Sequence, residues 1–446
     1  MKITLDTALY AFAAFVAVAS CGQPATQDGS STTQTVASTT GAGGAGGAGG
    51  ANSATPAAPA SSAAPWPGEG DDELLTAAKF GDGARAFTTV KDTLLKNYYA
   101  EGITEDDLYR AATAGMLEKL EPKMKKWNRL LSPKEMAELK NDLKGEVVGI
   151  GVQISFDSAS GYIDVLAALP GSPAERAGLV AGDKIVTVNG KLYKGMRTGD
   201  VVADIRGKAG EPVTLSILRA DKLLPFTVKR ERVLYDQPSH ATFPDGLGYV
   251  HIPSFTEKTP AQVKEALDDL AQKNVTSLIV DLRENPGGSF DSAVATAELL
   301  LPDDSGIVTL KKRSKDEDKH VARGKGVLTT VPLAVLVSNG TSSGAEFIAG
   351  ALQEGRHARL VGQHTMGKWS VQSLDDLPNG YAFKYTVSLF KTPAGRSYEG
   401  TGIAPDVEVA MNERELARAN VAKPGDRLAI DVQLRTAKEL LVPRVR

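Results

Sequence analysis

The chain has 446 residues, of which 42% are hydrophobic and 24% charged, and 51 basic and 54 acidic side chains give a formal net charge of -3. This length predicts several domains, and the near balance of charge predicts no nucleic-acid partner. The single cysteine, Cys21, excludes an intramolecular disulfide and a cysteine-rich zinc site. The sequence also has no phosphate-binding glycine loop and no histidine pair at metal-ligand spacing, so we expect no metal and no cofactor.

The first residues are typical of an export signal. Lys2 precedes a nearly continuous apolar run over residues 8–19, which is too short to span a bilayer comfortably. Small residues then stand directly before Cys21, as in a bacterial lipoprotein processing site. We therefore expect residues 1–21 to be a lipoprotein-type signal segment, with lipidated Cys21 holding the protein on a membrane of the bacterial cell envelope, facing the periplasm or the exterior. The alternative is ordinary cleavage, with Cys21 incidental.

Two segments without evident chemistry follow. Residues 22–70 are rich in Gly, Ala, Ser, Thr and Pro, which predicts a disordered tether. Residues 71–145 have a helical pattern, because Phe87, Val90 and Leu94 recur at steps of three and four. Packing or self-association is the expected role of this helical N-terminal unit. The protein could therefore form a homo-oligomer, with a second copy of the chain as its partner.

Strand patterns dominate the next part of the chain. In residues 146–233, short apolar or alternating runs lie between turn residues, which predicts a small β-domain. In residues 234–412, apolar strand runs such as 277–282 and 331–337 are each followed by a helical run, which predicts an α/β domain. Residues 413–446 have the composition of a helical tail.

Three blocks of the β-domain resemble a PDZ domain, namely residues 148–152, 170–179 and 182–190. A glycine-flanked turn can direct backbone N–H groups at a terminal carboxylate, and the adjoining strand edge can add a peptide. The expected peptide-binding residues are Gly149, Ile150, Gly151, Val152 and Arg206. The alternatives are a β-domain that serves only as a spacer and an Arg206 that is simply solvated.

Two residues of the α/β domain are candidates for nucleophilic catalysis. Ser343 stands where the strand 331–337 passes through a turn into a helix, whose first N–H groups can stabilise negative charge. A serine at this place is equally typical of a helix cap. Lys368 can act as a general base only where burial or a nearby cation lowers its pKa, and a lysine after glycine is otherwise a surface residue.

The sequence from Ser343 onward resembles the carboxyl-terminal processing peptidases. The shared features are Glu346 three residues after the serine, an alanine-rich helix, Lys368 at the spacing of the family's Ser-Lys dyad, and Gln372 beyond it. Two further blocks also match the family, residues 281–288 and 392–407.

The resemblance implies a role for each matched residue. Ser343 is the implied nucleophile, Lys368 the general base and Gln372 the residue that orients the lysine. The N–H of Gly344 and the turn at Gly287 and Gly288 are the implied oxyanion hole. The implied fold is multidomain α/β, with a helical N-terminal unit, a PDZ β-domain and a crotonase-like α/β peptidase core.

The chain also departs from the family pattern. Thr341-Ser342-Ser343 replaces the usual alternation of serine and alanine, which leaves open which serine attacks. Trp369 replaces a glycine after the lysine, so we expect a side chain that narrows or covers the site. The segment 122–133 is more basic than the family pattern predicts.

The sequence therefore predicts a serine endopeptidase that cleaves exported proteins near their C-termini, with proteins or peptides that have a free C-terminus as partners. One alternative is an α/β-hydrolase, because Gly340 to Gly344 fits the pattern Gly-x-Ser-x-Gly with Ser342 as nucleophile. That pattern needs an acid and then a histidine, yet His357 and His364 precede Asp375. The other alternative is a non-catalytic PDZ-bearing binding protein of the envelope.

Overall fold

The computed structural model describes residues 15–16, 34–36, 38–39, 81–120, 127–144, 147–157, 160–195, 198–233, 237–314, 317–422 and 424–441. Within residues 1–80 these include only three short strands, β1 (Phe15–Val16), β2 (Gln34–Val36) and β3 (Ser38–Thr39). Cys21, and with it nearly all of the expected signal segment and tether, lies outside the described residues. The described part of the chain contains no helix with the length and apolar character needed to cross a membrane.

The chain divides into two compact units, and residues 44–119 form the smaller one. Its described elements are two helices, α2 (Gly83–Asn97) and α3 (Glu105–Glu118). Thr104 and Asp107 form a capping box at the start of α3, in which each side chain accepts a hydrogen bond from the other residue's backbone N–H. This cap fixes where α3 begins.

The end of the expected helical unit differs from the sequence prediction. Residues 129–131 form a strand, β4 (Arg129–Leu131), which pairs with β21 (Ala382–Lys391) of the larger unit. Helix α4 (Pro133–Leu143) follows and packs its apolar side against the same sheet. The apolar residues that drive this packing are Leu131, Met136, Leu139, Leu143, Leu374 and Ala382. Residues 129–143 therefore belong to the larger unit, because their apolar face is buried against β20 and β21.

Residues 147–233 form the strand-rich domain. Its sheet has the antiparallel order β11-β10-β8-β7-β6, with β9 paired to β8, and a separate pair joins β5 to β12. The elements are β5 (Val147–Gly149), β6 (Val152–Asp157), β7 (Tyr162–Ala168), α5 (Pro173–Arg176), β8 (Lys184–Val188), β9 (Lys191–Leu192), α6 (Thr198–Ile205), β10 (Pro212–Arg219), β11 (Lys222–Lys229) and β12 (Glu231–Val233). Strand β6 lies at one edge of the sheet, so the described residues leave that edge open to an added strand.

The main sheet of the α/β domain has the order β13-β14-β15-β18-β19-β22. Its strands are β13 (Ser239–Phe243), β14 (Leu247–His251), β15 (Ser277–Asp281), β18 (Leu333–Val337), β19 (Arg359–Gly362) and β22 (Val407–Glu408), and a 3-10 turn, η2 (Pro244–Gly246), joins the first two. All pairs except β13–β14 are parallel. The carboxyl ends of the adjacent strands β15 and β18 therefore lie at the same edge of the sheet, where their turns meet.

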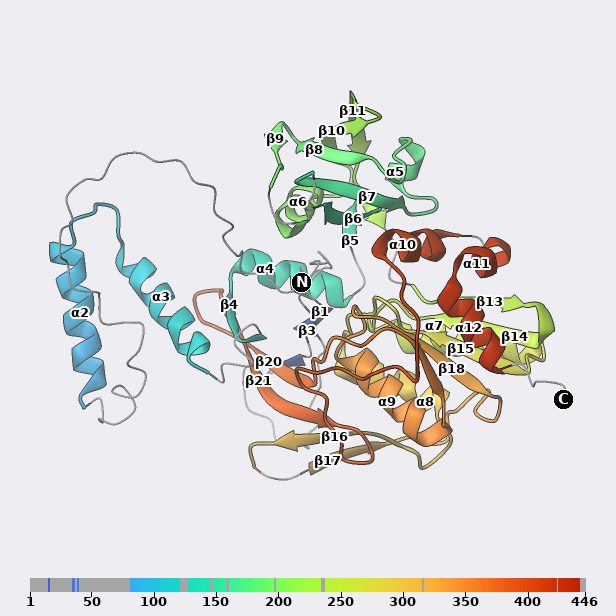
Figure 1. The fold of residues 1–446 in the computed structure, drawn as a ribbon. Coiled ribbons are helices and arrows are strands. Elements are labelled where there is room, and N and C mark those ends of the chain that lie inside the picture. Colours follow the sequence, from blue (N-terminus) through green and yellow to red (C-terminus); the bar gives the residue numbers. More distant parts are fainter. Residues whose placement is uncertain are drawn as a thin grey trace, which may run out of the picture. The chain divides into compact units, whose positions relative to one another are not determined.

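Helices cover both faces of this sheet. On one face lie α7 (Thr259–Gln272), α8 (Phe290–Leu300) and α9 (Gly344–Arg356), and α8 and α9 pack against each other (Figure 1). On the other face α12 (Val432–Leu441) contributes Leu434 and Ala437 to a cluster with Ile279 and Leu336. The continuously buried strands β15 and β18 match the apolar runs that the sequence showed.

A second sheet supports the site from the side of residue 368. Its order is β17-β16-β21-β20-β2, and its pairs are antiparallel. The strands not yet given are β16 (Gly306–Lys312), β17 (Glu317–Val321) and β20 (Ser370–Asp376). Strand β20 begins two residues after Lys368, so the sheet fixes the backbone on that side of the lysine.

The C-terminal tail forms α10 (Glu413–Val421), α11 (Pro424–Ile430) and α12. A buried ionic network fastens this tail to the turn that follows β15. The Arg283 guanidinium donates to both carboxylate oxygens of Asp281, at 2.9 and 2.5 Å, and to both of Asp431, at 3.0 and 2.8 Å. All three side chains are fully buried, so removing one member leaves an uncompensated charge in the interior.

Replacing Asp431 by alanine is expected to lower the free energy of unfolding by about 3 kcal/mol, because Arg283 then lacks half of its negative partners. Urea unfolding followed by circular dichroism measures this change. Asp426→Ala, at an exposed carboxylate on α11, is the matched control. A loss below about 1 kcal/mol for Asp431→Ala would show that water or relaxation replaces the ion pair.

Candidate active site

Ser343 lies in the turn between β18 and α9, directly before the first residue of the helix. Its backbone has φ 55° and ψ −117°, a region that side-chain-bearing residues rarely adopt. The residue is fully buried, and its hydroxyl has no hydrogen-bond partner among the described residues. A serine that served only as a helix cap would use this hydroxyl to bind a helix N–H. The strained backbone and unused hydroxyl favour the nucleophile interpretation.

A single buried carboxylate, that of Glu346, connects the two segments that the sequence singled out. Its Oε2 accepts hydrogen bonds from the backbone N–H of Ser343 at 3.0 Å and from that of Lys368 at 2.8 Å. Its Oε1 accepts from the N–H of Gly367 at 2.8 Å and from the Thr365 hydroxyl at 2.6 Å. Glu346 therefore holds the backbones of residues 343 and 368 on one side chain, although they are far apart in the sequence.

The role of Glu346 was not assigned from the sequence. The signal for it was present, because Ser-x-x-Glu before an apolar helix is a capping-box pattern and predicts that the glutamate turns back to the serine N–H. The pattern does not predict the hydrogen bonds that the same carboxylate accepts from residues 365–369. Burial raises the pKa of Glu346, and the hydrogen bonds to its carboxylate oppose that rise.

Lys368 is fully buried, which excludes the alternative of a surface lysine. Its side-chain nitrogen, Nζ, lies over the Trp127 ring, 4.9 Å from the ring centre. Trp127 is also buried and comes from the basic segment that departs from the family pattern. The segment therefore supplies a wall for the lysine, a role that the sequence did not predict.

Gln372 is buried on β20, four residues beyond Lys368. Its side-chain amide donates to the Ser370 hydroxyl at 2.9 Å and lies 3.4 Å from the Thr386 hydroxyl on the neighbouring strand. These contacts fix the side chain inside the sheet layer that carries the lysine. Its role in orienting Lys368 stays a prediction.

The glycine turn after β15 packs directly against the serine. A Cβ atom placed on Gly287 would lie 2.9 Å from Ser343 Cβ and 3.2 Å from the Gly344 nitrogen, so only glycine fits there at its φ of 97°. The Gly287 N–H donates to Asn285 Oδ1 at 2.8 Å. Among the described residues, the N–H groups of Gly344 and Gly288 have no such acceptor. These two are therefore the better placed oxyanion donors of the three predicted.

Trp369 does not cover the site, contrary to the expectation from sequence. Its side chain is fully buried, its indole N–H donates to Glu346 at 3.2 Å, and its ring packs on Tyr398 with centroids 5.1 Å apart. The ring lies beside Gly350 of α9, where an added Cβ atom would come within 3.5 Å of it. Trp369 thus acts as a fifth donor to the carboxylate that joins residues 343 and 368.

The structure disfavours Ser342 as a hydrolase nucleophile. Its hydroxyl is buried and, like the Ser343 hydroxyl, has no hydrogen-bond partner among the described residues, so the two hydroxyls differ only in the bases near them. His357 lies at the far end of the 13-residue helix α9, and both His357 and His364 are exposed. A nucleophile elbow needs its base within hydrogen-bond reach of the serine.

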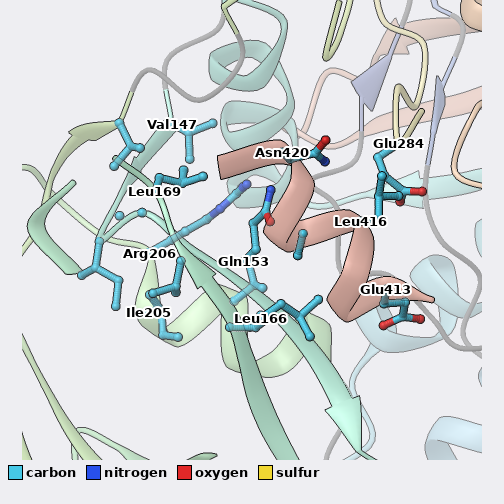
Figure 2. Close-up of a pocket in the computed structure, with 18 residues that line it drawn as sticks. Val147, Gln153, Leu166, Leu169, Ile205, Arg206, Glu284, Glu413, Leu416 and Asn420 are labelled. Atoms are coloured by element: carbon cyan, nitrogen blue, oxygen red, sulfur yellow. The ribbon is translucent and has the colours of Figure 1, made fainter. Parts of the chain in front are cut away.

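All five predicted peptide-binding residues line one cavity of about 130 Å³ in the strand-rich domain, namely Gly149, Ile150, Gly151, Val152 and Arg206. Figure 2 shows the cavity, with Arg206 reaching in from the end of α6. The Arg206 guanidinium lies 3.4 Å from the Asp142 carboxylate, so it is paired and not simply solvated. Burial raises the pKa of Asp142 to about 6, and Arg206 opposes that rise.

Glu284 stands between this cavity and the glycine turn. Its side chain lines the cavity, its backbone has φ 58°, and it comes three residues before Gly287. The Ser338 hydroxyl donates to its Oε1 at 2.7 Å. Burial raises the pKa of Glu284 to about 7, while the bond from Ser338 and the nearby Arg283 lower it.

The raised pKa predicts how stability depends on pH. A carboxyl with an ordinary pKa of 4.5 when unfolded and about 7 when folded binds more protons in the folded state between these values. The contribution of Glu284 to the free energy of unfolding is therefore fully present below pH 4.5 and is lost as the pH rises through 7. Because the side chain is only half-buried, we expect a loss of about 2 kcal/mol from pH 5 to 8 that Glu284→Gln does not show. The measurement is urea unfolding of both proteins at each pH. If the free energy of unfolding changed with pH by the same amount in the wild type and in Glu284→Gln, this prediction would be wrong.

Comparison with known protein families identifies two parts of the chain. Residues 246–409 match the model for peptidase family S41, and residues 165–219 match a model for the PDZ domain. The matched ranges fall inside the α/β domain and the strand-rich domain, respectively.

Several characterised proteins are similar over most of their length. The carboxyl-terminal-processing protease of Synechocystis is 33% identical over 71% of this chain and 73% of its own. The carboxy-terminal processing protease CtpA of Bacillus subtilis is 31% identical over 71% of this chain and 67% of its own. A solved structure, the photosystem II D1 C-terminal processing protease, is 29% identical, covers 76% of this chain and 92% of its own, and superposes with a TM-score of 0.51.

Proposed function

Because the chain belongs to the carboxyl-terminal processing peptidases of family S41, we propose that it cleaves exported proteins near their C-termini through a Ser343–Lys368 dyad. One observation carries the proposal. The carboxylate of Glu346 binds the backbone N–H groups of both residues, so the hydroxyl with no partner and the buried lysine belong to one site. A serine and a buried lysine in one site can perform acyl transfer without a metal or a histidine.

The proposed reaction begins with proton transfer from the Ser343 hydroxyl to the neutral Lys368 amine. The serine oxygen then attacks the peptide carbonyl, and the N–H groups of Gly344 and Gly288 stabilise the negative oxygen that forms. The Lys368 ammonium gives its proton to the leaving amine, which departs and leaves an ester on Ser343. Lys368 next takes a proton from a water molecule, whose oxygen attacks the ester. The Lys368 ammonium then gives this proton to the departing Ser343 oxygen, which releases the shortened protein and restores the enzyme. Gln372 orients the lysine in both halves.

The PDZ domain is the proposed substrate-capture module. The predicted peptide-binding residues line one cavity next to β6, the edge strand of the sheet, which is the arrangement that adds a peptide as an extra strand. Capture at the C-terminus would set which bonds of the substrate reach Ser343. The proposed location is the bacterial cell envelope, with lipidated Cys21 as the membrane anchor.

A pair of otherwise identical peptides, one with a free C-terminal carboxylate and one with an amide, tests the proposal. Mass spectrometry of the products is expected to show cleavage of the free peptide near its C-terminus and about tenfold slower cleavage of the amide. The reason is that an amide cannot form the charge-assisted hydrogen bonds that a terminal carboxylate accepts. Ser343→Ala protein should cleave neither peptide. Cleavage by the variant at the wild-type rate would contradict the assignment of Ser343, and equal rates for the two peptides would contradict capture at the C-terminus.

A further inference from the structure

The cavity in the PDZ domain has a second wall that the domain itself does not supply. One side is formed by Val202, Ile205 and Arg206 from α6 and the residue that follows it. The other side is formed by α10 of the C-terminal tail, through Leu416, Ala417 and Asn420. Gln153 and Ile154 of edge strand β6 line the same cavity, so a peptide added to β6 would lie against both walls.

Contacts with the sheet fix which face α10 covers. The Ser155 hydroxyl donates to Glu413 at 2.5 Å, and Arg414 forms an ion pair with Asp164. Ala417 packs on Leu166 of β7. Ile154, by contrast, points into the core of the PDZ domain, on the side of α6. Because successive side chains of a strand alternate between faces, α6 and α10 cover opposite faces of the sheet at its open edge.

The α10 side of the cavity carries two acidic side chains, and burial raises the pKa of one of them, Glu284, to about 7, so its negative charge forms fully only above that pH. Glu284 and Glu413 both line it, and neither forms an ion pair with any described residue. One oxygen of Glu284, Oε2, is buried and has no hydrogen-bond partner among the described residues. On the opposite side Arg206 is already paired with Asp142. Figure 2 shows Arg206 on one side of Leu416, and Glu284 and Glu413 on the other.

These observations point to the side chains that the cavity selects. A peptide that pairs with β6 must direct alternate side chains to α6 and to α10. The wall formed by Ile150, Val202 and Ile205 suits an apolar side chain, while the wall that carries Glu284 and Glu413 suits a positive charge.

We propose that the PDZ cavity binds protein C-termini with an apolar last residue and a lysine or arginine in the penultimate position, read by Glu284 and Glu413. This inference rests on the proposed capture of substrate C-termini and specifies its chemistry. The bound cation supplies the ion pair that both carboxylates lack among the described residues. The helix α10 is thereby a specificity element, although it lies outside the PDZ sequence.

Fluorescence anisotropy of labelled peptides with the Ser343→Ala protein tests this without cleavage. The peptides end in an apolar residue and carry lysine, norleucine or glutamate in the penultimate position, and a fourth peptide has its lysine moved one residue further from the C-terminus. We expect the lysine peptide to bind about fivefold more tightly than the norleucine peptide and the glutamate peptide to bind more weakly than both. The moved lysine should give no advantage, because its side chain faces α6.

Charge variants locate the effect. Glu413→Gln and Glu284→Gln should each reduce the preference for lysine, and Glu413→Lys should reverse it in favour of glutamate. Glu439→Gln, at an exposed carboxylate on α12, should leave the preference unchanged. Equal binding of the lysine and norleucine peptides, or no binding of any peptide, would overturn the inference.

Cleavage by the wild-type protein is measured separately with the same peptides. Cleavage without a charge preference in binding would contradict only the assignment of Glu284 and Glu413. A charge preference in binding without cleavage would contradict the proposed peptidase activity and support the specificity of the cavity.

Discussion

Replacing Ser343 by alanine is expected to lower kcat/KM by about 10⁴-fold or more, and Lys368→Met is expected to cost a similar factor. In the proposed mechanism, the Ser343 hydroxyl is the attacking group and the buried Lys368 amine is its base. Because the two residues act in one proton transfer, the double variant should lose little more than either single variant. Cleavage of a fluorogenic peptide measures all three rates.

Ser342→Ala is the matched control, because Ser342 is the neighbouring buried serine and has the same unused hydroxyl. It should keep activity within a few-fold of the wild type. Circular dichroism and thermal unfolding must show that each variant folds, since all these positions are in the interior. Activity lost in Ser342→Ala and kept in Ser343→Ala would restore the α/β-hydrolase alternative.

Local patterns in the sequence predicted the elements of the α/β domain that hold the serine. The apolar run at 331–337 is a fully buried strand, and the residues after it turn into α9 as expected. The catalytic assignment needed more than pattern, because a serine at a helix start is as typical of a cap as of a nucleophile. Only the spacing to Lys368 and Gln372, read through the family resemblance, separated these interpretations.

Contacts between segments that are far apart in the sequence could not be predicted from it. Nothing near Trp127 indicates that its ring lies over the side-chain nitrogen of Lys368, and nothing near Trp369 indicates that its indole turns inward to Glu346. The strand β4 was missed because three residues are too few to show a period. In the same way the sequence of α10 shows an amphipathic helix but does not show that its partner is the PDZ sheet.

The buried position of Glu346 leads to the second large effect. Glu346→Gln is expected to lower kcat by about 100-fold and the free energy of unfolding by about 3 kcal/mol, with little change in KM. The carboxylate accepts five hydrogen bonds, from Ser343, Thr365, Gly367, Lys368 and Trp369. Glutamine keeps one acceptor oxygen and places an NH₂ group where the other oxygen was. The donors that bonded that oxygen then face another donor and lose their hydrogen bonds.

The loss should reach catalysis because the same carboxylate fixes the backbones of residues 343 and 368. Steady-state kinetics and urea unfolding, measured on the same preparation, separate the two effects. Glu354→Gln is the control from the same helix, because Glu354 bonds Arg396 near the surface and has no contact with the site. If Glu346→Gln lost stability and kept kcat per folded molecule, Glu346 would be a packing residue that does not position the dyad. A lower kcat together with the stability loss would place it among the positioning residues, since strain at Ser343 persists only while its surroundings hold it.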